Sequence, residues 1–397
     1  MKILFISDVY FPRVNGVSTS IRTFAGQLQE LGHEVHLVAP DYGVATEDEA
    51  WVRRIPARSI HFDPEDKLMR YGAALDKLQE LRQQNYDVVH IHTPFVAHYL
   101  GLKLAHLLDV PSVETYHTFF EDYLHHYLPW LPKALAKWFA RQLSRRQCNA
   151  VNVIVAPSPM LDVLRQYGVK THAEVIPTGL QAHSFERADA AVFRARHGIA
   201  LERPVMLYVG RVAHEKNIDF LLRMADVLRK QQPDVLLVIA GEGPALASLR
   251  ALSAELGLQD NILFIGYLDR NTELNACYRP ADVFVFASKS ETQGLVLLEA
   301  MAQSVPVVAL AELGTKSILI EGQGALIATE NEAVFADKVL SLLRNPRKRT
   351  ALGRVARNYA MKHWTSRSQA EHLLHLYQQL TDNALTDFAV RPILLQA

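Results

Sequence analysis

Short, uninterrupted apolar runs alternate with segments of helical pattern along the whole chain, and they do so in two successive sets. The first set predicts strands and helices at Lys2–Ile6, Ser18–Leu31, Glu34–Ala39, Leu75–Gln84, Val88–Ile91, Ser112–Thr115 and Val153–Ala156. Continuous apolar strands separated by helices are typical of a parallel sheet that is covered on both faces. The first half is therefore predicted to be a doubly wound α/β domain.

The second set repeats this alternation. It predicts strands and helices at Val205–Val209, Ile218–Arg229, Val235–Ala240, Ala245–Leu256, Ile262–Ile265, Val283–Phe286 and in a helix after Gly294. The segment Ile176–Gly179 and the charged stretch up to Pro204 are interpreted as a hinge. With 397 residues, the chain is long enough for two domains that each bury a core.

We therefore expect two Rossmann-like domains, residues 1–180 and 181–365, that face each other across a cleft. In such folds ligands bind at the carboxyl ends of the strands. A last helix, Ser366–Leu380, has a row of apolar residues and is a candidate to pack back on the first domain.

Composition excludes several classes of function. The 42 Lys and Arg residues balance the 42 Asp and Glu residues, so no net charge draws the chain to nucleic acid. Cys148 and Cys277 are far apart and suit a reducing compartment. The apolar run before Asp8 is too short for a signal peptide, and no apolar stretch reaches membrane-spanning length. A cytoplasmic protein is expected.

The segment 288–306 places two carboxylates, Glu291 and Glu299, around a glycine that opens an apolar helix. A helix start offers unpaired N–H groups, so the amides of Gly294 and Leu295 are candidates to hold a phosphate. On one continuous helix the two carboxylates would lie about 12 Å apart along the axis and about 80° apart around it. Acid and base pairs in glycosidases are roughly 5–9.5 Å apart, so two separate hydroxyl-binding carboxylates are the better interpretation.

Two cations follow the first strand of the second domain. Arg211 and Lys216 lie in the segment Gly210–Asn217, at a strand end where they would be able to bind a diphosphate. A charge pair at ~4 Å is worth up to ~4 kcal/mol at an effective dielectric of ~20, before desolvation. The alternative is an ordinary exposed charged turn.

Other strand ends carry weaker signals. Gly16 lies between the first strand and a helix, where a glycine lets a phosphate or sugar approach the backbone. His117 follows the strand that ends at Thr115 and would be able to bind a sugar hydroxyl or move a proton. A purely structural role remains the alternative for both. The loop Gly241–Pro244 lacks the last glycine of a dinucleotide fingerprint.

Metal ligands are not apparent in the sequence. No Asp-x-Asp triplet occurs, and no Cys or His cluster has the spacing of a metal site. Phosphate charge would then be met by protein cations and helix dipoles, so we expect a metal-independent site without a cofactor.

The segment 119–146 combines aromatic and basic residues. Candidates for contact with an anionic membrane surface are Trp130, Lys133, Lys137, Trp138, Arg141 and Arg145. A basic amphipathic helix with aromatic residues can lie in a membrane interface, each cation contributing ~1 kcal/mol. The alternative is a surface helix whose apolar side packs on its own domain.

Together these motifs resemble the retaining glycosyltransferases of family 4, which have the GT-B fold, over about residues 1–365. The motifs, in chain order, are Asn15–Val17, Tyr116-His117, Gly210–Asn217, Gly241–Pro244 and Glu291 to Glu299. Two departures from the family pattern are Asn15-Gly16 in place of Gly-Gly and Thr292-Gln293 in place of Ser-Phe. The second departure, and the segment Tyr116–Tyr123, look like the diacylglycerol glucosyltransferases.

The resemblance implies a role for each candidate residue. The diphosphate of a nucleotide-sugar donor would be held by Gly16, Arg211, Lys216 and the amides of Gly294 and Leu295. Glu299 would hold the ribose hydroxyls, Glu291 the sugar hydroxyls, and the backbone near Tyr267 the base. His117 would lie near the anomeric carbon, so His117, Glu291, Arg211 and Lys216 are the catalytic candidates.

The expected function is transfer of a hexose from a UDP-sugar, UDP-glucose being the leading candidate, to an acceptor hydroxyl. Diacylglycerol in a membrane is the acceptor that the resemblance favours, which would place the protein peripherally at the inner face of the cytoplasmic membrane. The alternatives are transfer to a soluble glycan or polysaccharide precursor, a UDP-sugar epimerase, and a noncatalytic nucleotide-sugar sensor.

Overall fold

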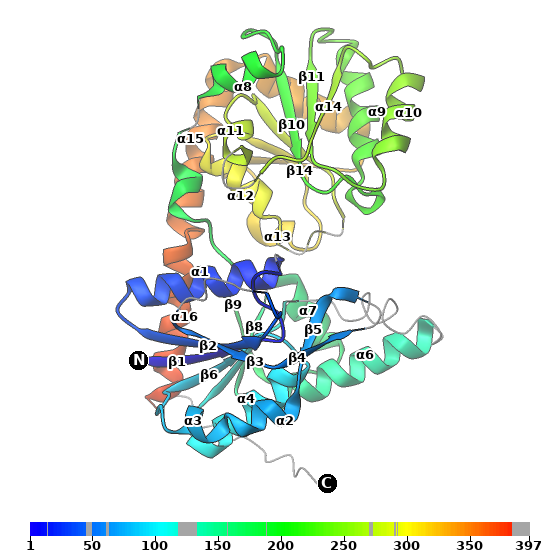
Figure 1. Cartoon of the computed structure of the whole chain (residues 1–397). Helices are drawn as coiled ribbons and strands as arrows, with labels where there is room; N and C mark the ends of the chain where they lie inside the picture. The colour runs from blue at the N-terminus through cyan, green and yellow to red at the C-terminus, as the bar shows by residue number, and fades with distance from the viewer. Residues whose placement is uncertain are drawn as a thin grey trace. The chain divides into compact units, whose positions relative to one another are not determined.

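The structure is a computed structural model, and Figure 1 shows the whole chain. It describes residues 1–382 apart from 14, 45–49, 61–62, 118–132, 157, 188, 270–272, 290 and 292. The chain divides into two compact units. Unit 1 comprises Met1–Thr178 and the chain from Gln369 onward, and unit 2 comprises Gly179–Ser368.

Unit 1 is built on a parallel sheet of seven strands in the order β3-β2-β1-β6-β7-β8-β9. The strands are β1 (Lys2–Ile6), β2 (Glu34–Pro40), β3 (Val52–Ile55), β6 (Val88–Ile91), β7 (Ser112–Thr115), β8 (Val153–Ala156) and β9 (His172–Val175). A separate antiparallel hairpin joins β4 (Ala57–Ile60) to β5 (Asp63–Met69). The strand order reverses between β1 and β6, which is where doubly wound sheets bind ligands.

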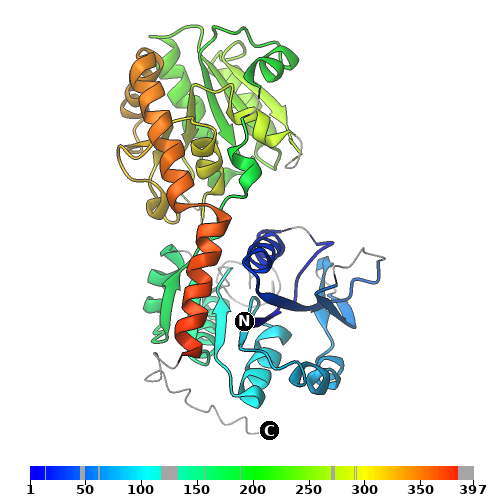
Figure 2. The same cartoon turned by 90° about the vertical axis from the view of Figure 1, so that its left-hand side faces the viewer.

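Helices cover both faces of this sheet. They are α1 (Gly16–Glu30), α2 (Tyr71–Asp76), α3 (Leu78–Arg82), α4 (Val96–Leu108), α6 (Lys133–Cys148), α7 (Ser158–Gln166) and α16 (Ser366–Thr381). One core cluster joins the sheet to α1 and α16, and a second joins its other face to α2, α3, α4 and α7. Figure 2 shows α16 in red beside the unit 1 sheet. Leu373, Leu376 and Tyr377 of α16 are fully buried there.

Two sequence predictions for unit 1 need correction. The helix predicted at Leu75–Gln84 is broken into α2 and α3, because Lys77 ends the first and begins the second. Strands β3 and β9 were not predicted, and their sequences Val-Arg-Arg-Ile and His-Ala-Glu-Val lack an uninterrupted apolar run. Both are edge strands, each with a neighbour on one side only, so they need not be apolar on both faces.

Unit 2 repeats the doubly wound plan with six parallel strands in the order β12-β11-β10-β13-β14-β15. The strands are β10 (Val205–Val209), β11 (Leu236–Ala240), β12 (Ile262–Gly266), β13 (Val283–Phe286), β14 (Val307–Leu310) and β15 (Ala325–Ala328). The strand order reverses between β10 and β13. The strands predicted at Val205–Val209 and Val283–Phe286 have the predicted bounds, whereas β14 and β15 were not predicted.

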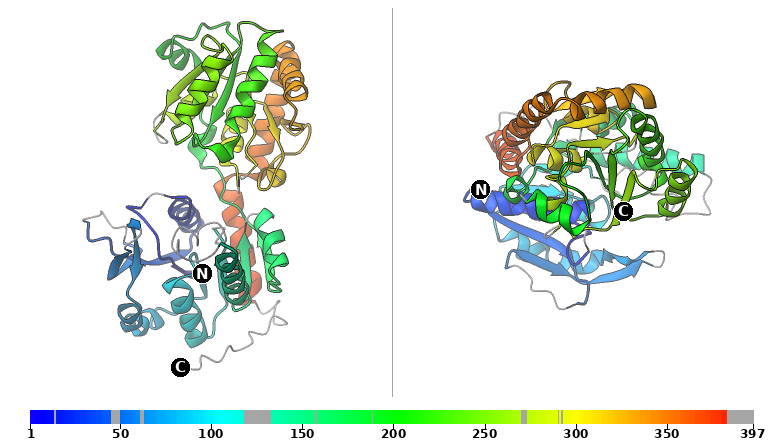
Figure 3. Two further views of the ribbon diagram at one scale, coloured as in Figure 1. Left: turned by 90° about the vertical axis from the view of Figure 1, so that its right-hand side faces the viewer. Right: turned by 90° about the horizontal axis from the view of Figure 1, so that it is seen from above.

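Helices also cover both faces of the unit 2 sheet, with α9, α10 and α14 on one side and α11, α12 and α15 on the other (Figures 1 and 3). The helical segments are η1 (Ala182–Phe185), α8 (Ala190–Arg196), η2 (His214–Lys216), α9 (Ile218–Arg229), α10 (Leu246–Glu255), α11 (Leu274–Tyr278), α12 (Leu295–Ala302), α13 (Thr315–Ile318), α14 (Glu332–Leu343) and α15 (Pro346–His363). In the described part of the chain, no helix is long and apolar enough to cross a membrane.

The predicted hinge is too long. Most of the charged stretch before Pro204 belongs to unit 2 and contains η1 and α8. Arg194 of α8 is buried and donates hydrogen bonds to the carbonyl oxygens of Pro280, Ala200 and Leu201. A guanidinium can be buried when its donors are satisfied in this way, which explains why a charged segment is part of a packed domain.

Candidate active site

The candidate donor residues of unit 2 lie where its strand order reverses. Arg211 follows β10, Lys216 ends the short helix η2, and Glu291 lies in the loop after β13. Lys216 Nζ is 2.9 Å from Glu291 Oε2, and the two side chains are 18% and 21% exposed. Arg211 is well exposed and lies 3.8 Å from Glu215. The fold thus brings Lys216 and Glu291, 75 positions apart in sequence, into direct contact.

Glu291 also contacts the start of α12. Gly294 has a left-handed backbone with φ 74° and precedes the first helical residue, Leu295. Its N–H group donates to Glu291 Oε1 at 3.3 Å. The carboxylate therefore bridges Lys216 and the helix start. An anion that bound at the Gly294 amide would have to displace this carboxylate, which the sequence did not indicate.

Glu299 and Tyr267 have very different surroundings. Glu299 lies inside α12 and is buried, and its Oε2 accepts a hydrogen bond of 2.6 Å from the Tyr278 hydroxyl. That bond fixes the orientation of the carboxylate. Tyr267 follows β12 and is 68% exposed. The sequence placed Glu291 in the loop and Glu299 in the helix, as the structure does.

The glycines of the loop Gly241–Pro244 have a packing role. A Cβ on Gly241 would lie 1.9 Å from the carbonyl oxygen of Gly210, and one on Gly243 would lie 2.3 Å from that of Val212. Real Cβ atoms do not approach backbone so closely. These glycines therefore let the loop after β11 pack against the loop that carries Arg211.

Unit 1 contributes Gly16 and His117. Gly16 is the first residue of α1, and the Asn15 side chain caps that helix by accepting the Ser18 N–H at 2.9 Å. A Cβ on Gly16 would meet no atom within 4 Å, so packing inside the chain does not require glycine there. His117 follows β7 and is partly buried.

His117 is the end of a row of three histidines. His92 Nδ1 lies 3.2 Å from His117 Nε2, and the rings of His92 and His90 stack with centroids 4.2 Å apart. His90 in turn contacts the hydroxyls of Tyr377 at 2.5 Å and Thr115 at 2.7 Å. Burial lowers the pKa of His117 to about 4 and that of His90 to about 3, so both are neutral at pH 7.

The hydrogen-bond network indicates which nitrogen of His117 carries its proton. His92 Nε2 is buried and has no hydrogen-bond partner among the described residues. A buried N–H without an acceptor is more costly than a buried lone pair without a donor, so we place the His92 proton on Nδ1. His92 then donates to His117 Nε2, and His117 carries its own proton on Nδ1.

Asp8 is a candidate that sequence reasoning missed. It follows β1, and its Oδ2 accepts hydrogen bonds from the Thr93 hydroxyl at 2.8 Å and the Ala97 N–H at 3.1 Å. Its Oδ1 is buried without a partner among the described residues. Burial raises the pKa of Asp8 to about 6, although these hydrogen bonds act in the opposite direction. The available signal was its position directly after an apolar strand, at the reversal of strand order.

Helix α6 exposes several of the residues that were predicted to contact an anionic membrane surface. Trp138 and Phe139 are 57% and 47% exposed, whereas Ala140 and Ser144 form part of the buried side of the helix. The helix thus packs one side on its own domain, as in the alternative, and exposes these two aromatic residues on another side. Lys137, Arg141 and Arg145 are also exposed. Trp130 and the side chain of Lys133 lie outside the described residues, as do Thr292 and most of Tyr116–Tyr123.

The structure thus groups the candidates by unit. Unit 2 holds Arg211, Lys216, Tyr267, Gly294, Leu295, Glu291 and Glu299, and unit 1 holds Gly16 and His117. Within the described residues, no group of three or more His, Cys, Asp or Glu side chains is arranged to hold a metal ion.

Comparisons with known proteins define the family. Residues 14–184 match the model for Glycosyltransferase Family 4, and residues 189–359 match that for Glycosyl transferases group 1. The chain is 35% identical to an alpha-monoglucosyldiacylglycerol synthase from Streptococcus pneumoniae, over 78% of this chain and 71% of that protein. It is 28% identical to the synthase of the same name from Acholeplasma laidlawii, over 96% and 98% of the two chains.

Solved structures show the same fold. The Anabaena protein HepE in complex with UDP has a TM-score of 0.74 and 16% identity, covering 96% of this chain and all of that one. Sucrose-phosphate synthase from Thermosynechococcus elongatus has a TM-score of 0.73 and 20% identity over the same coverage. The predicted α/β class and GT-B fold are confirmed.

The chain belongs to glycosyltransferase family 4, and it is a sugar-transferring enzyme. The comparisons do not favour the alternative of a nucleotide-sugar epimerase, because both matching family models describe glycosyltransferases and both similar synthases are named for a glucosylated lipid.

Proposed function

We propose that this enzyme transfers glucose from UDP-glucose to the free hydroxyl of diacylglycerol at a membrane surface, with retention of anomeric configuration. The observation that carries the proposal is the contact of Lys216 with Glu291 beside the start of α12, at the reversal of strand order in unit 2. The glucose and diacylglycerol of the proposal come from the two similar synthases, whose names describe glucosyldiacylglycerol. UDP comes from the complex of the structurally similar HepE.

In this proposal, Lys216 exchanges Glu291 for the diphosphate of the donor. Negative charge on the leaving diphosphate grows as the glycosidic bond breaks, so Lys216 and Arg211 stabilise the transition state more than the ground state. Glu291, released by Lys216, accepts hydrogen bonds from the sugar hydroxyls. Glu299, oriented by Tyr278, binds the ribose hydroxyls. The acceptor hydroxyl forms its bond to the anomeric carbon on the face from which the diphosphate departs, and the departing phosphate oxygen takes the hydroxyl proton.

His117 acts in this scheme as a neutral hydrogen-bonding group. With a pKa of about 4 it carries no positive charge at pH 7. Donation from His92 to Nε2 leaves its Nδ1–H to donate to a sugar or acceptor oxygen. Asp8 and Thr93, linked across the reversal between β1 and β6, are further polar groups at the same end of the unit 1 sheet.

Helix α6 provides the membrane contact in this proposal. Its exposed Trp138 and Phe139 can enter the headgroup region while Lys137 and Arg141 stay near anionic headgroups. Flotation with anionic vesicles tests this step. Lys137→Glu/Arg141→Glu should abolish flotation, and Arg347→Glu on α15 is the control for a surface charge change. Flotation that survives the double variant contradicts the membrane contact.

The central experiment measures UDP release from a panel of nucleotide sugars, with and without diacylglycerol in mixed micelles. We expect rapid UDP release from UDP-glucose only when diacylglycerol is present, with an α-linked glucosyl lipid as the product. Release that depends on a soluble glycan and ignores the lipid would assign a different acceptor. Binding of donor without any UDP release would indicate a noncatalytic sensor.

A further inference from the structure

A charged cavity of unit 2 lies at the opposite end of the sheet from Lys216 and Glu291. Its volume is about 970 Å³. Its lining includes Pro280–Asp282, which directly precede β13, and Ser304 and Pro306, which precede β14. All strands of this sheet are parallel, so the amino ends of β13 and β14 face away from the edge that carries Glu291. This cavity is therefore separate from the proposed donor site.

Arginines dominate the cavity lining. Six of them contribute to it, against two aspartates, although the chain as a whole has no net charge. Three of the six have structural roles: Arg194 binds backbone carbonyls, Arg349 lies 3.2 Å from Asp282, and Arg357 donates to the carbonyl oxygens of Ala302 and Phe185. Packing and local hydrogen bonds thus explain these three side chains.

The other three arginines have no such explanation. Arg187, Arg279 and Arg354 make no hydrogen bond or ion pair with the described residues, and they come from the segment before α8, the end of α11 and the middle of α15. Burial, and to a smaller extent the positive charges of Arg187 and Arg279, lowers the pKa of Arg357. Mutual repulsion of this kind opposes the gathering of arginines, and an anion among them would relieve it.

The two aspartates of the lining do not neutralise these three. Asp282 contacts Arg194 and Arg349 and also accepts the Val205 N–H at 2.8 Å. Asp189 caps α8 by accepting the Ala191 N–H. Asp282 is therefore shared by two other arginines, and the charge of Asp189 offsets at most one of the three, so the lining keeps a net positive charge.

We propose that this cavity binds a phosphate-bearing ligand through Arg187, Arg279 and Arg354. Phosphate oxygens accept the paired N–H groups of guanidinium with good geometry, which makes arginine suited to this ligand. The source is either a soluble phosphate compound or the headgroup of an anionic phospholipid.

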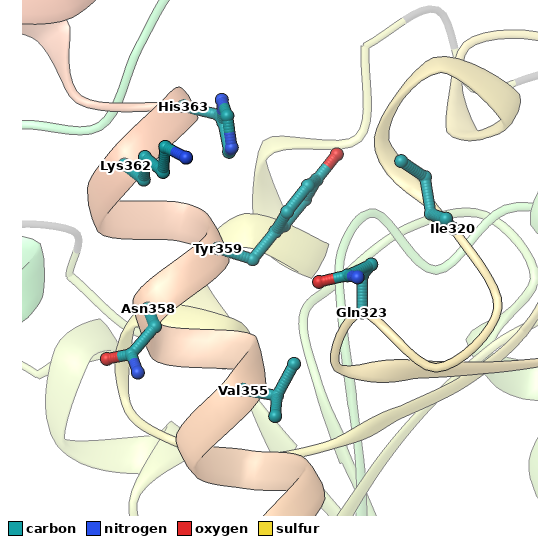
Figure 4. Close-up of a pocket in the computed structure, with 7 residues that line it drawn as sticks. All are labelled: Ile320, Gln323, Val355, Asn358, Tyr359, Lys362 and His363. Atoms are coloured by element: carbon teal, nitrogen blue, oxygen red, sulfur yellow. The ribbon is translucent and has the colours of Figure 1, made fainter.

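A smaller cavity along α15 provides a contrast (Figure 4). It has a volume of about 470 Å³ and is lined by Ile320, Gln323, Val355, Asn358, Tyr359, Lys362 and His363. This lining contains one lysine and no arginine, and the Tyr359 hydroxyl donates to the Ile318 carbonyl oxygen. The single lysine of this lining does not indicate a site for a polyanion. Of these two cavities, only the larger one gathers arginines.

Calorimetric titration of inorganic pyrophosphate into the full chain tests the proposal. Arg279→Gln/Arg354→Gln should weaken binding at least tenfold, equivalent to about 1.4 kcal/mol. The matched control, Arg347→Gln/Lys348→Gln, removes two charges from the same helix α15 outside the cavity and should change affinity less than twofold. Neither substituted cavity arginine has an ion pair, so the thermal midpoint should stay close to that of the wild type.

Lys216→Ala distinguishes this site from the donor site. Pyrophosphate binding that is lost in Lys216→Ala but unchanged in Arg279→Gln/Arg354→Gln belongs to the donor site and overturns the proposal. Binding lost only in the arginine variant supports it, whatever the outcome for UDP-glucose turnover.

Vesicles identify the source of the phosphate. Loss of binding to phosphatidylglycerol vesicles in the arginine variant, measured against phosphatidylcholine vesicles, assigns a lipid headgroup. Unchanged vesicle binding with weakened pyrophosphate binding assigns a soluble phosphate compound. If the arginine variant changes neither pyrophosphate binding nor vesicle binding, the cavity has no phosphate ligand and the proposal fails.

Discussion

The buried carboxyl group of Asp8 should make the stability of the protein depend on pH in a specific way. The pKa of this group is about 6 in the folded chain, compared with 3.8 for an ordinary aspartate. Between these two values the folded state holds more protons than the unfolded state. The free energy of unfolding should therefore fall as the pH rises from about 4 to about 6.

The expected size follows from the shift. About 2.2 pKa units at 1.36 kcal/mol per unit correspond to about 3 kcal/mol. The contribution of protonated Asp8 is fully present below pH 3.8 and is lost above pH 6. A loss of this size is a substantial part of the 5–15 kcal/mol typical of a folded domain. A carboxyl group that destabilises the fold by this much at neutral pH, and whose Oδ1 has no partner among the described residues, suggests a functional reason for its burial.

Urea unfolding of wild type and Asp8→Asn at a series of pH values between 4 and 7.5 measures this effect. Asparagine cannot titrate, so the wild type should lose about 3 kcal/mol relative to the variant across this range. Any constant cost of the buried amide cancels in the comparison. Asp162→Asn, at an exposed position on α7, is the control and should show no such trend. A difference between wild type and Asp8→Asn that stays constant with pH would refute the reasoning.

Four further predictions concern the proposed reaction. Lys216→Ala should lower turnover by ~10²–10³ in steady-state assays, because it removes a charge that stabilises the leaving diphosphate, and near-normal turnover would contradict this role. Glu291→Gln should weaken binding of UDP-glucose but tighten binding of UDP, because Lys216 loses its competing carboxylate. Calorimetry measures both affinities, and a change in the same direction for both ligands would contradict this exchange. Gly16→Ala should raise KM for the donor without lowering the thermal midpoint, while Gly26→Ala, which also has open space at Cβ, should leave KM unchanged. Because the pKa of His117 is about 4, protonation of this residue should not lower kcat/KM between pH 8 and pH 5. A fall in kcat/KM below about pH 6.5 that His117→Gln removes would contradict this expectation.

The sequence predicted the central strands well because their signal is local. An uninterrupted apolar run such as Val283–Phe286 is sufficient to indicate a strand buried on both faces, and its bounds in the structure are the same. Strand ends and helix starts also have local signals, through which Arg211 and Glu291 respectively became candidates. Edge strand β9 was missed because it pairs with β8 only and has a polar sequence.

The missed parts depend on residues that are distant in sequence. The environment of Asp8 is made by Thr93 and Ala97, and that of His90 by Tyr377, which is 287 positions away. Burial of these groups, and so their shifted pKa values, results from packing that no local pattern reports. The same holds for the six arginines of the large cavity, which come from separate segments of unit 2.

The contact between Lys216 and Glu291 has a consequence for how a donor would bind in the proposed reaction. Both side chains are about one-fifth exposed, so each loses part of its hydration and depends on the other for compensation. A diphosphate that takes Lys216 leaves Glu291 without its cation, and UDP alone offers no group to replace it. The hydroxyls of an attached sugar supply hydrogen-bond donors for that carboxylate. When the intact donor binds, Lys216 takes the diphosphate and Glu291 takes the sugar hydroxyls, so both side chains keep a partner. UDP alone provides a partner only for Lys216, so it binds more weakly than the donor and is released after transfer.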